Sequence, residues 1–186
     1  MTNLKTLFSR ALLALALLGG AATASPIYHV ALDTAGTSGD GYLQIDFLPF
    51  GTTDVLTATI SGLDGAFTGT PDLANVTQSG GAYTLSSDAF SEFFQAITLG
   101  GKFGFDVTFG GVPLDAGSTG LTVSLLDAGF DYLALPAAQI TLVAGEAPAV
   151  AVDPAFASVN AVPEPRDWLL VATGLILLAA MQRRRA

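Results

Sequence analysis

The chain of 186 residues has no cysteine, one histidine and one tryptophan, and only 12% of its residues are charged. The absence of cysteine excludes disulfides, thiolate metal sites and cysteine nucleophiles. Cations are scarce as well, because Lys102 is the only lysine or arginine between residues 25 and 162. This one cation stands against 14 acidic residues, so the middle segment has a net charge of −13, which excludes nucleic acid as its partner.

Two long apolar runs are present, and each lies near one end of the sequence. The first, Ala11–Leu18, follows two cationic residues and is followed by Ala22 and Ala24. Cationic residues, a short apolar core and small residues two positions apart are typical of a secretory signal peptide with cleavage after Ala24. We therefore expect residues 1–24 to form a signal helix that signal peptidase removes during export.

The second apolar run covers residues 168–181, begins at Trp168 and is followed by Arg183, Arg184 and Arg185. A helix over this run would be about 21 Å long, which is shorter than the hydrocarbon core of a bilayer. It is nevertheless apolar on all sides, with an aromatic residue at one boundary and cations at the other. We therefore expect a transmembrane helix with the arginines in the cytoplasm and the middle domain in the periplasm.

The last part of the chain combines Pro163-Glu164-Pro165, an aromatic residue at 168, Gly174 within the apolar run and the closing arginines. In this order of features, residues 163–186 resemble the PEP-CTERM sorting signal of Gram-negative bacteria. The resemblance implies that Pro163, Glu164 and Pro165 are recognised by exosortase, a membrane-embedded enzyme similar to a transpeptidase. It further implies a bacterium that makes exopolysaccharide, and a protein that reaches the cell surface or the extracellular matrix after processing.

The middle of the chain, residues 25–144, has short apolar stretches separated by clusters of Gly, Asp, Ser and Thr. The stretches that we expect to be strands are 26–33, 42–50, 55–60, 103–109, 121–125 and 140–143. Their spacing predicts one mainly β domain, an antiparallel β-sandwich of the jelly-roll or immunoglobulin-like kind. Residues 28–34 and 105–109 also resemble a small uncharacterised group of PEP-CTERM proteins, which implies no known activity.

Two segments depart from the strand pattern. Between Asp88 and Ile97, apolar residues recur at helical spacing at Phe90, Phe93 and Phe94, which predicts one short α-helix. Residues 145–162 are rich in Ala, Pro and Val and show no apolar period. We expect that segment to be a tether that holds the domain away from the membrane.

No pattern in the sequence assigns a catalytic residue. His29 is the only histidine, so it cannot build a multi-histidine metal site, and neither H-E-x-x-H nor G-x-S-x-G occurs. Asp33 with Asp40, and Asp127 with Asp131, flank Gly-containing turns and are the candidates for a calcium site. Aspartates in such turns also serve as solvated turn residues that bond their own backbone. We expect no enzyme, and no cofactor other than calcium at these turns.

Three functions remain after these exclusions. The first is a structural or adhesive protein of the cell surface or extracellular matrix, and the second is a carbohydrate-binding module for exopolysaccharide. The third is a secreted hydrolase. A row of exposed aromatic residues on one sheet face favours the second function, and two converging carboxylates in a deep cleft favour the third.

Overall fold

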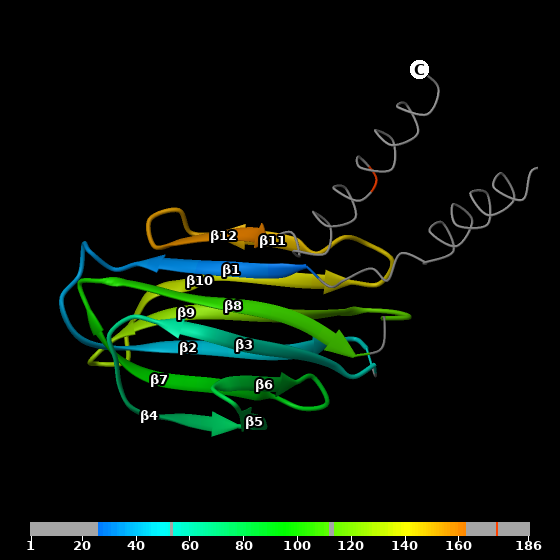
Figure 1. The fold of residues 1–186 in the computed structure, drawn as a ribbon, viewed down its shortest axis with the longest axis horizontal. Coiled ribbons are helices and arrows are strands. Elements are labelled where there is room, and N and C mark those ends of the chain that lie inside the picture. The colour runs from blue at the N-terminus through cyan, green and yellow to red at the C-terminus, as the bar shows by residue number, and fades with distance from the viewer. Residues whose placement is uncertain (1–25, 53, 112–113, 163–173, 175–186) are drawn as a thin grey trace, which may run out of the picture.

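Two antiparallel sheets of six strands each, stacked face to face, make up the domain (Figure 1). The computed structural model describes residues 26–52, 54–111, 114–162 and residue 174. From edge to edge, sheet A contains β12 (Ala157–Val162), β1 (Ile27–Asp33), β8 (Lys102–Gly111), β3 (Leu56–Asp64), β6 (Ala82–Ser86) and β5 (Val76–Ser79). Sheet B contains β11 (Ala149–Val152), β10 (Tyr132–Val143), β9 (Ser118–Asp127), β2 (Gly39–Phe50), β7 (Ser91–Leu99) and β4 (Phe67–Ala74). The prediction of a mainly β, antiparallel arrangement of two sheets is confirmed.

The alternation of apolar residues with more polar ones along the sequence explains why these strands form. Each of the six predicted strands overlaps an observed one, namely β1, β2, β3, β8, β9 or β10. On β2, Leu43, Ile45 and Phe47 are fully buried, while the residues between them are partly exposed. Because successive side chains of a strand point to opposite faces, one set packs against the other sheet and the second set faces solvent.

The hydrophobic core lies between the two sheets and receives side chains from both. Phe47 of sheet B contacts Phe109 of sheet A with ring centroids 6.1 Å apart, and Phe93 contacts Tyr83 across the same space at 4.8 Å. Fully burying one large apolar side chain contributes about 1.5–3 kcal/mol. The domain is therefore held together by its core, which is consistent with a chain that has no disulfide.

The helix predicted over residues 88–97 is wrong, because Ser91–Leu99 is strand β7 and pairs with β2. Phe93 faces the core, Phe94 faces outward, and Phe90 lies in the preceding loop with 48% of its surface exposed. Apolar residues thus occupy both faces of this strand, which imitates helical spacing. The polar Gln95 also interrupts the strand pattern, because it occupies a buried position. Its amide donates there to a backbone carbonyl of the bulged neighbouring strand β4.

The tether predicted over residues 145–162 is wrong as well. This segment supplies β11 and β12, the edge strands of sheet B and sheet A. Val150 of β11 lies opposite Ile140 of β10, and Val159 of β12 lies opposite Val30 of β1. All four residues of β11 are exposed, so no buried face imposes an apolar period on the sequence. The domain therefore extends to the end of β12.

The segments predicted to direct export lie outside the described residues. They are the signal peptide 1–24, with Ala22 and Ala24, and the sorting segment 163–186, of which only Gly174 is described, in helical conformation. The other sorting and anchor residues in question are Pro163, Glu164, Pro165, Trp168, Arg183, Arg184 and Arg185. Within the residues that the structure describes, no helix is long and apolar enough to cross a bilayer. Export and anchoring stay predictions.

Candidate functional site

Four aromatic residues gather on the outer face of sheet B. The rings of Tyr42 on β2 and Phe94 on β7 are 5.0 Å apart with planes inclined by 20°. The ring of Phe130, from the loop between β9 and β10, lies 4.7 Å from Tyr42 at 11° and 6.3 Å from Phe94 at 18°. These distances place the three ring centres in a triangle rather than in a straight column. Tyr132, at the start of β10, adds a fourth ring, and we call the four residues the aromatic platform.

Strand alternation turns the platform away from the core. Tyr42 precedes the buried Leu43, and Phe94 follows the buried Phe93, so both rings lie on the solvent side of sheet B. Phe130 is 58% exposed and Tyr132 is 50% exposed. Single exposed apolar residues are ordinary on protein surfaces, whereas a contiguous group of them indicates a surface that contacts a ligand or partner.

The loop that carries Phe130 is organised by Asp127. The Asp127 Oδ1 atom accepts the backbone N–H groups of Gly129 and Asp131 at 2.8 and 3.0 Å. The backbone N–H of Asp127 also donates to the carbonyl of Asp131 at 2.9 Å. Phe130 has a φ of 64°, a left-handed conformation that bulky residues rarely adopt. The turn therefore holds Phe130 in a strained conformation that places its ring against Tyr42, and such strain is concentrated at functional positions in proteins.

Two carboxylates border the platform on the same face. Asp46 of β2 lies directly opposite Glu92 of β7, and we call these two residues the acidic pair. The Gln44 Nε2 atom donates to both carboxylate oxygens of Asp46 at 3.2 Å and to Glu92 Oε2 at 3.4 Å. The Gln44 Oε1 atom accepts the hydroxyl group of Tyr132 at 3.3 Å. Gln44 therefore joins the aromatic platform to the acidic pair.

Burial raises the pKa of Asp46 to about 6, the hydrogen bond from Gln44 opposes this rise, and the negative charge of Glu92 adds to it. The cause is that a half-buried carboxylate loses hydration without gaining a cation. Among the described residues, Lys102 forms an ion pair with Asp33, His29 contacts Asp106, and both contacts belong to sheet A. The charge of the acidic pair is thus not compensated by a described cation.

A hydroxyl group without a partner lies next to Gln44. Ser124 on β9 is opposite Gln44, is fully buried, and its Oγ atom has no hydrogen-bond partner. Tyr132 belongs to β10, which is separated from β2 by β9. Its hydroxyl group nevertheless reaches Gln44 on β2, so its side chain crosses β9 at Ser124. Leaving a buried hydroxyl unsatisfied costs about 1–3 kcal/mol.

The aspartates predicted as calcium candidates lie at two turns. Asp33 ends β1, where its Oδ1 accepts the N–H of Ala35 and its Oδ2 lies 3.9 Å from Lys102 Nζ. Asp40 lies on β2 opposite Thr98. The other candidates, Asp127 and Asp131, form the loop that carries Phe130. Among the residues that the structure describes, no group of three or more His, Asp or Glu is placed to hold a metal ion.

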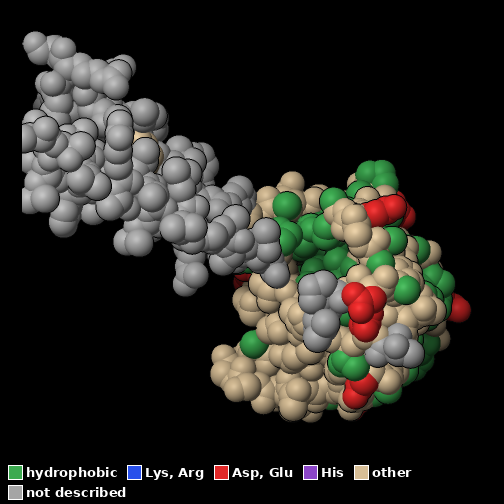
Figure 2. All heavy atoms as spheres, turned by 90° about the vertical axis from the view of Figure 1, so that its right-hand side faces the viewer, with side chains coloured by type: hydrophobic (Ala, Val, Ile, Leu, Met, Phe, Trp, Pro, Cys, Tyr) green, Lys and Arg blue, Asp and Glu red, His purple; other side chains and the backbone are tan. Residues whose placement is uncertain are grey.

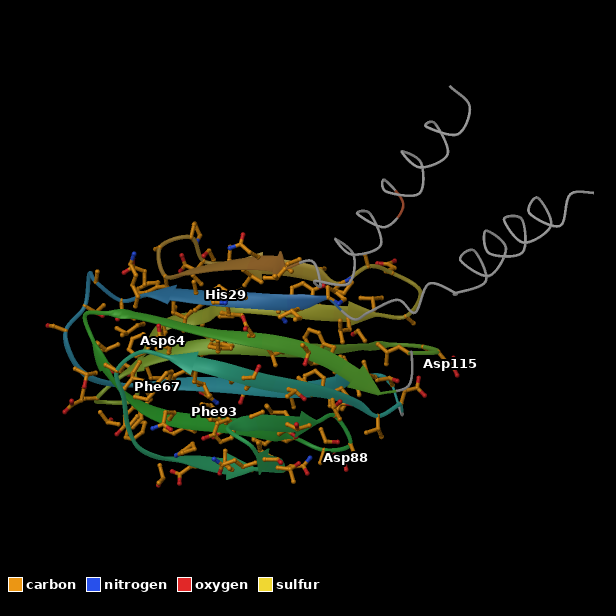
Figure 3. The ribbon with its side chains drawn as sticks, viewed as in Figure 1. His29, Asp64, Phe67, Asp88, Phe93 and Asp115 are labelled. Carbon is orange, nitrogen blue, oxygen red and sulfur yellow. The ribbon has the colours of Figure 1, made fainter. Side chains whose placement is uncertain are left out.

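His29 lies on the outer face of sheet A, as its buried neighbours Tyr28 and Val30 predict (Figure 3). Its Nδ1 atom is 2.8 Å from the Oδ1 atom of Asp106 on β8, and the two side chains are 46% and 43% exposed. This pair is on the opposite side of the sandwich from the aromatic platform. It ties two neighbouring strands of sheet A together.

Sequence reasoning missed the platform, although one signal was available. The alternation on β2 that buries Leu43 and Ile45 also places Tyr42, Gln44 and Asp46 together on the solvent side. Phe94 was hidden by the helical spacing of its neighbours. No local pattern predicts that a loop at the end of β9 brings Phe130 onto Tyr42, because that contact depends on the pairing of β2 with β9.

No protein-family model, curated protein or solved structure matches this chain. The function is therefore argued from the arrangement of the site itself. The rings of the platform offer exposed apolar surface, and the carboxylates and the amide beside it offer hydrogen-bond partners. Such a combination binds a ligand without covalent chemistry and fixes its orientation through the polar groups.

Proposed function

We propose that this protein is an exported adhesive protein of the cell surface or extracellular matrix whose β domain binds a polysaccharide on the aromatic platform. The observation that carries the proposal is the set of nearly parallel rings on one open sheet face. The faces of sugar rings present C–H groups with partial positive charge, and the face of an aromatic ring is negative. Sugar units therefore stack on such rings.

The polar groups beside the platform supply what stacking alone lacks. Stacking is tolerant of sugar type, whereas hydrogen bonds to hydroxyl groups fix orientation and register. Asp46 lies four residues along β2 from Tyr42, a distance of about 13 Å at 3.3 Å per residue. This length exceeds one sugar ring, so the face suits a stretch of a polymer lying across the sheet rather than a single sugar.

The other two functions explain less of this face. A purely structural role gives no reason for a strained loop that holds an exposed phenylalanine against Tyr42. A hydrolase is supported by paired carboxylates, and Asp46 and Glu92 form such a pair. The platform beside that pair is open to solvent rather than enclosed in a deep cleft, however, so we propose binding without cleavage. Release of reducing ends from a bound polysaccharide would contradict this choice.

The binding proposal is tested with the full chain in detergent micelles and soluble oligosaccharides, by isothermal titration calorimetry. Replacing Phe130 with Ala removes one stacking ring, and we expect affinity to fall about tenfold or more. Phe90→Ala is the matched control, because Phe90 is a similarly exposed phenylalanine outside the platform. Equal effects of the two substitutions, or none from Phe130→Ala, would contradict the proposal.

Export and anchoring are proposed from the two end segments. Residues 1–24 are removed by signal peptidase, and residues 163–186 hold the protein in the inner membrane until exosortase acts at Pro163-Glu164-Pro165. Intact-mass analysis of the native protein is the test. We expect a product that starts at Ser25 and lacks the C-terminal run. A product that still ends at Ala186 in cells with an active exosortase contradicts the processing step.

A further inference from the structure

We propose that the polysaccharide bound at the aromatic platform carries free ammonium groups, as a polymer of deacetylated amino sugars does, and that the acidic pair selects it. This inference rests on the proposed function, because it names the ligand class of the same face. It differs in what it requires of the ligand. Stacking requires only the C–H face of a sugar ring, whereas the acidic pair requires a positive charge.

The acidic pair is an arrangement that a cation would improve. Asp46 and Glu92 lie directly opposite each other on neighbouring antiparallel strands, where like charges destabilise the sheet. A ligand ammonium placed between them forms hydrogen bonds assisted by charge, which are stronger and shorter than neutral ones. The repulsion between the two carboxylates is an unfavourable interaction that a cationic ligand relieves.

The protein itself supplies no cation to this place within the described residues. The lysine and the histidine of that part of the chain are both engaged on sheet A, with Asp33 and Asp106. Figure 2 views the end of the sandwich where Asp88 and Asp115 lie in Figure 3, and the described surface in that view carries acidic side chains but no Lys or Arg. The negative field of the domain attracts a polycation and repels uronic or sulfated polymers.

The hydrogen bonds already made on this face leave room for the ligand. The two N–H groups of the Gln44 amide are shared among the two oxygens of Asp46 and one oxygen of Glu92, and a carboxylate has about four acceptor positions. The face therefore retains acceptors for an ammonium group.

The rings and the carboxylates act on neighbouring units of the same chain. Gln44 joins the two groups through its bond to Tyr132, so their spacing is fixed by the sheet. A sugar stacked on the platform places the next units of a polymer over the acidic pair. An ammonium group that lies over a ring face is also attracted by the negative face of that ring. Both halves of the site thus favour the same ligand.

The test compares oligomers of equal length in three chemical forms: glucosamine with free amines, N-acetylglucosamine and glucose. The protein is the full chain in detergent micelles. We expect the free-amine oligomer to bind about tenfold more tightly than the acetylated one. In the Asp46→Asn/Glu92→Gln variant this preference disappears, while binding of the neutral oligomers remains. The control variant Asp115→Asn/Glu146→Gln removes the same charge at exposed positions away from the face and keeps the preference.

Two further arms separate the failure of this inference from the failure of the proposed function. If all three oligomers bind equally and Phe130→Ala weakens each of them, the platform binds sugars but the acidic pair selects nothing, so this inference is overturned alone. If a polylysine competes as well as the free-amine oligomer and Phe130→Ala has no effect, binding is general attraction to an acidic protein. That result overturns both the inference and the proposed function.

Discussion

The two sheets enclose one common core but present different chemistry to solvent. On sheet A the outward groups bind each other, since the hydroxyl oxygens of Thr59 and Thr84 are 3.1 Å apart and His29 pairs with Asp106. On sheet B, aromatic rings, two carboxylates without a described cation and the unpartnered Ser124 share one face. A face whose polar groups are satisfied gains little from a ligand. The face of sheet B has exposed apolar area and like charges side by side, and a ligand improves both.

The largest effect on the free energy of unfolding is expected when an inward residue of sheet B is replaced rather than its outward neighbour. Phe93 is 1% exposed and Phe94 is its outward neighbour on β7. Phe93→Ala leaves a cavity in the core and should lower the free energy of unfolding by about 3–5 kcal/mol. Phe94→Ala removes only surface stacking and should cost under about 1.5 kcal/mol, while it weakens polysaccharide binding. Denaturant unfolding followed by circular dichroism, together with binding titrations, measures both effects.

Equal destabilisation by Phe93→Ala and Phe94→Ala would contradict the distinction between the two faces of β7, because it would mean that the platform is part of the core. The same experiment tests the corrected assignment of this segment. In a helix with the spacing that the sequence indicates, both phenylalanines would face the core and both substitutions would be costly.

The core was more predictable from the sequence than the site, for a physical reason. Burial imposes a period of two wherever one face of a strand packs against the other sheet, as on β3, where Leu56, Ala58 and Ile60 are buried. The edges receive no such constraint, so the exposed β11 was interpreted as part of a tether. On β7 the outward face also carries an aromatic residue, so Phe94 beside Phe93 removed the alternation that identifies a strand. The residues that make the site unusual also concealed it.

The loop contacts of the site could not be predicted from local patterns. Asp127 was proposed for a turn, and it does organise one, but its place beneath Phe130 is set by the register between β2 and β9. Asp46 likewise stands out only when β7 brings Glu92 opposite it. Pairings between distant segments determine which of the 14 acidic residues between residues 25 and 162 lie side by side, and composition carries no information about them.

A smaller effect is expected from the half-buried carboxyl of sheet B. Burial raises the pKa of Asp46 to about 6, above its ordinary value of about 4. The folded state therefore holds a proton that the unfolded state has released, so stability should fall as pH rises from about 4 to 6 and stay level above that. The groups that face Asp46 are Gln44 on its own strand, Glu92 on β7 and Thr122 on β9.

The substitution Asp46→Asn should remove this dependence. We expect it to raise the free energy of unfolding by about 1–2 kcal/mol at pH 8 and by little at pH 4, since solvent reaches part of the carboxyl and screens its charge. Thermal unfolding at both pH values is the measurement. A pH profile that keeps its slope between pH 4 and 6 in the variant would show that another group causes it.

Ser124→Ala tests the buried hydroxyl on β9. Removing a buried hydroxyl that has no partner relieves its lost hydration, so we expect the free energy of unfolding to rise by about 1 kcal/mol. Polysaccharide affinity should be unchanged in the same variant, because the fully buried hydroxyl does not reach a ligand on the sheet face. A decrease in stability would instead show that Ser124 already has a partner in the folded protein.

The smallest effect is expected from a substitution on sheet A, which should leave polysaccharide affinity unchanged. Asp106→Asn removes the charge opposite His29 but leaves an oxygen that can still accept the hydrogen bond. Because both side chains are nearly half exposed, their contact contributes at most about 1 kcal/mol, and salt screens any charge contribution further. Polysaccharide affinity should be unchanged within error, since this pair lies across the core from the platform. The variant also removes one unit of negative charge, as each substitution in the acidic pair does. A fall in affinity here would therefore mean that the overall charge of the domain, rather than the face of sheet B, attracts the ligand.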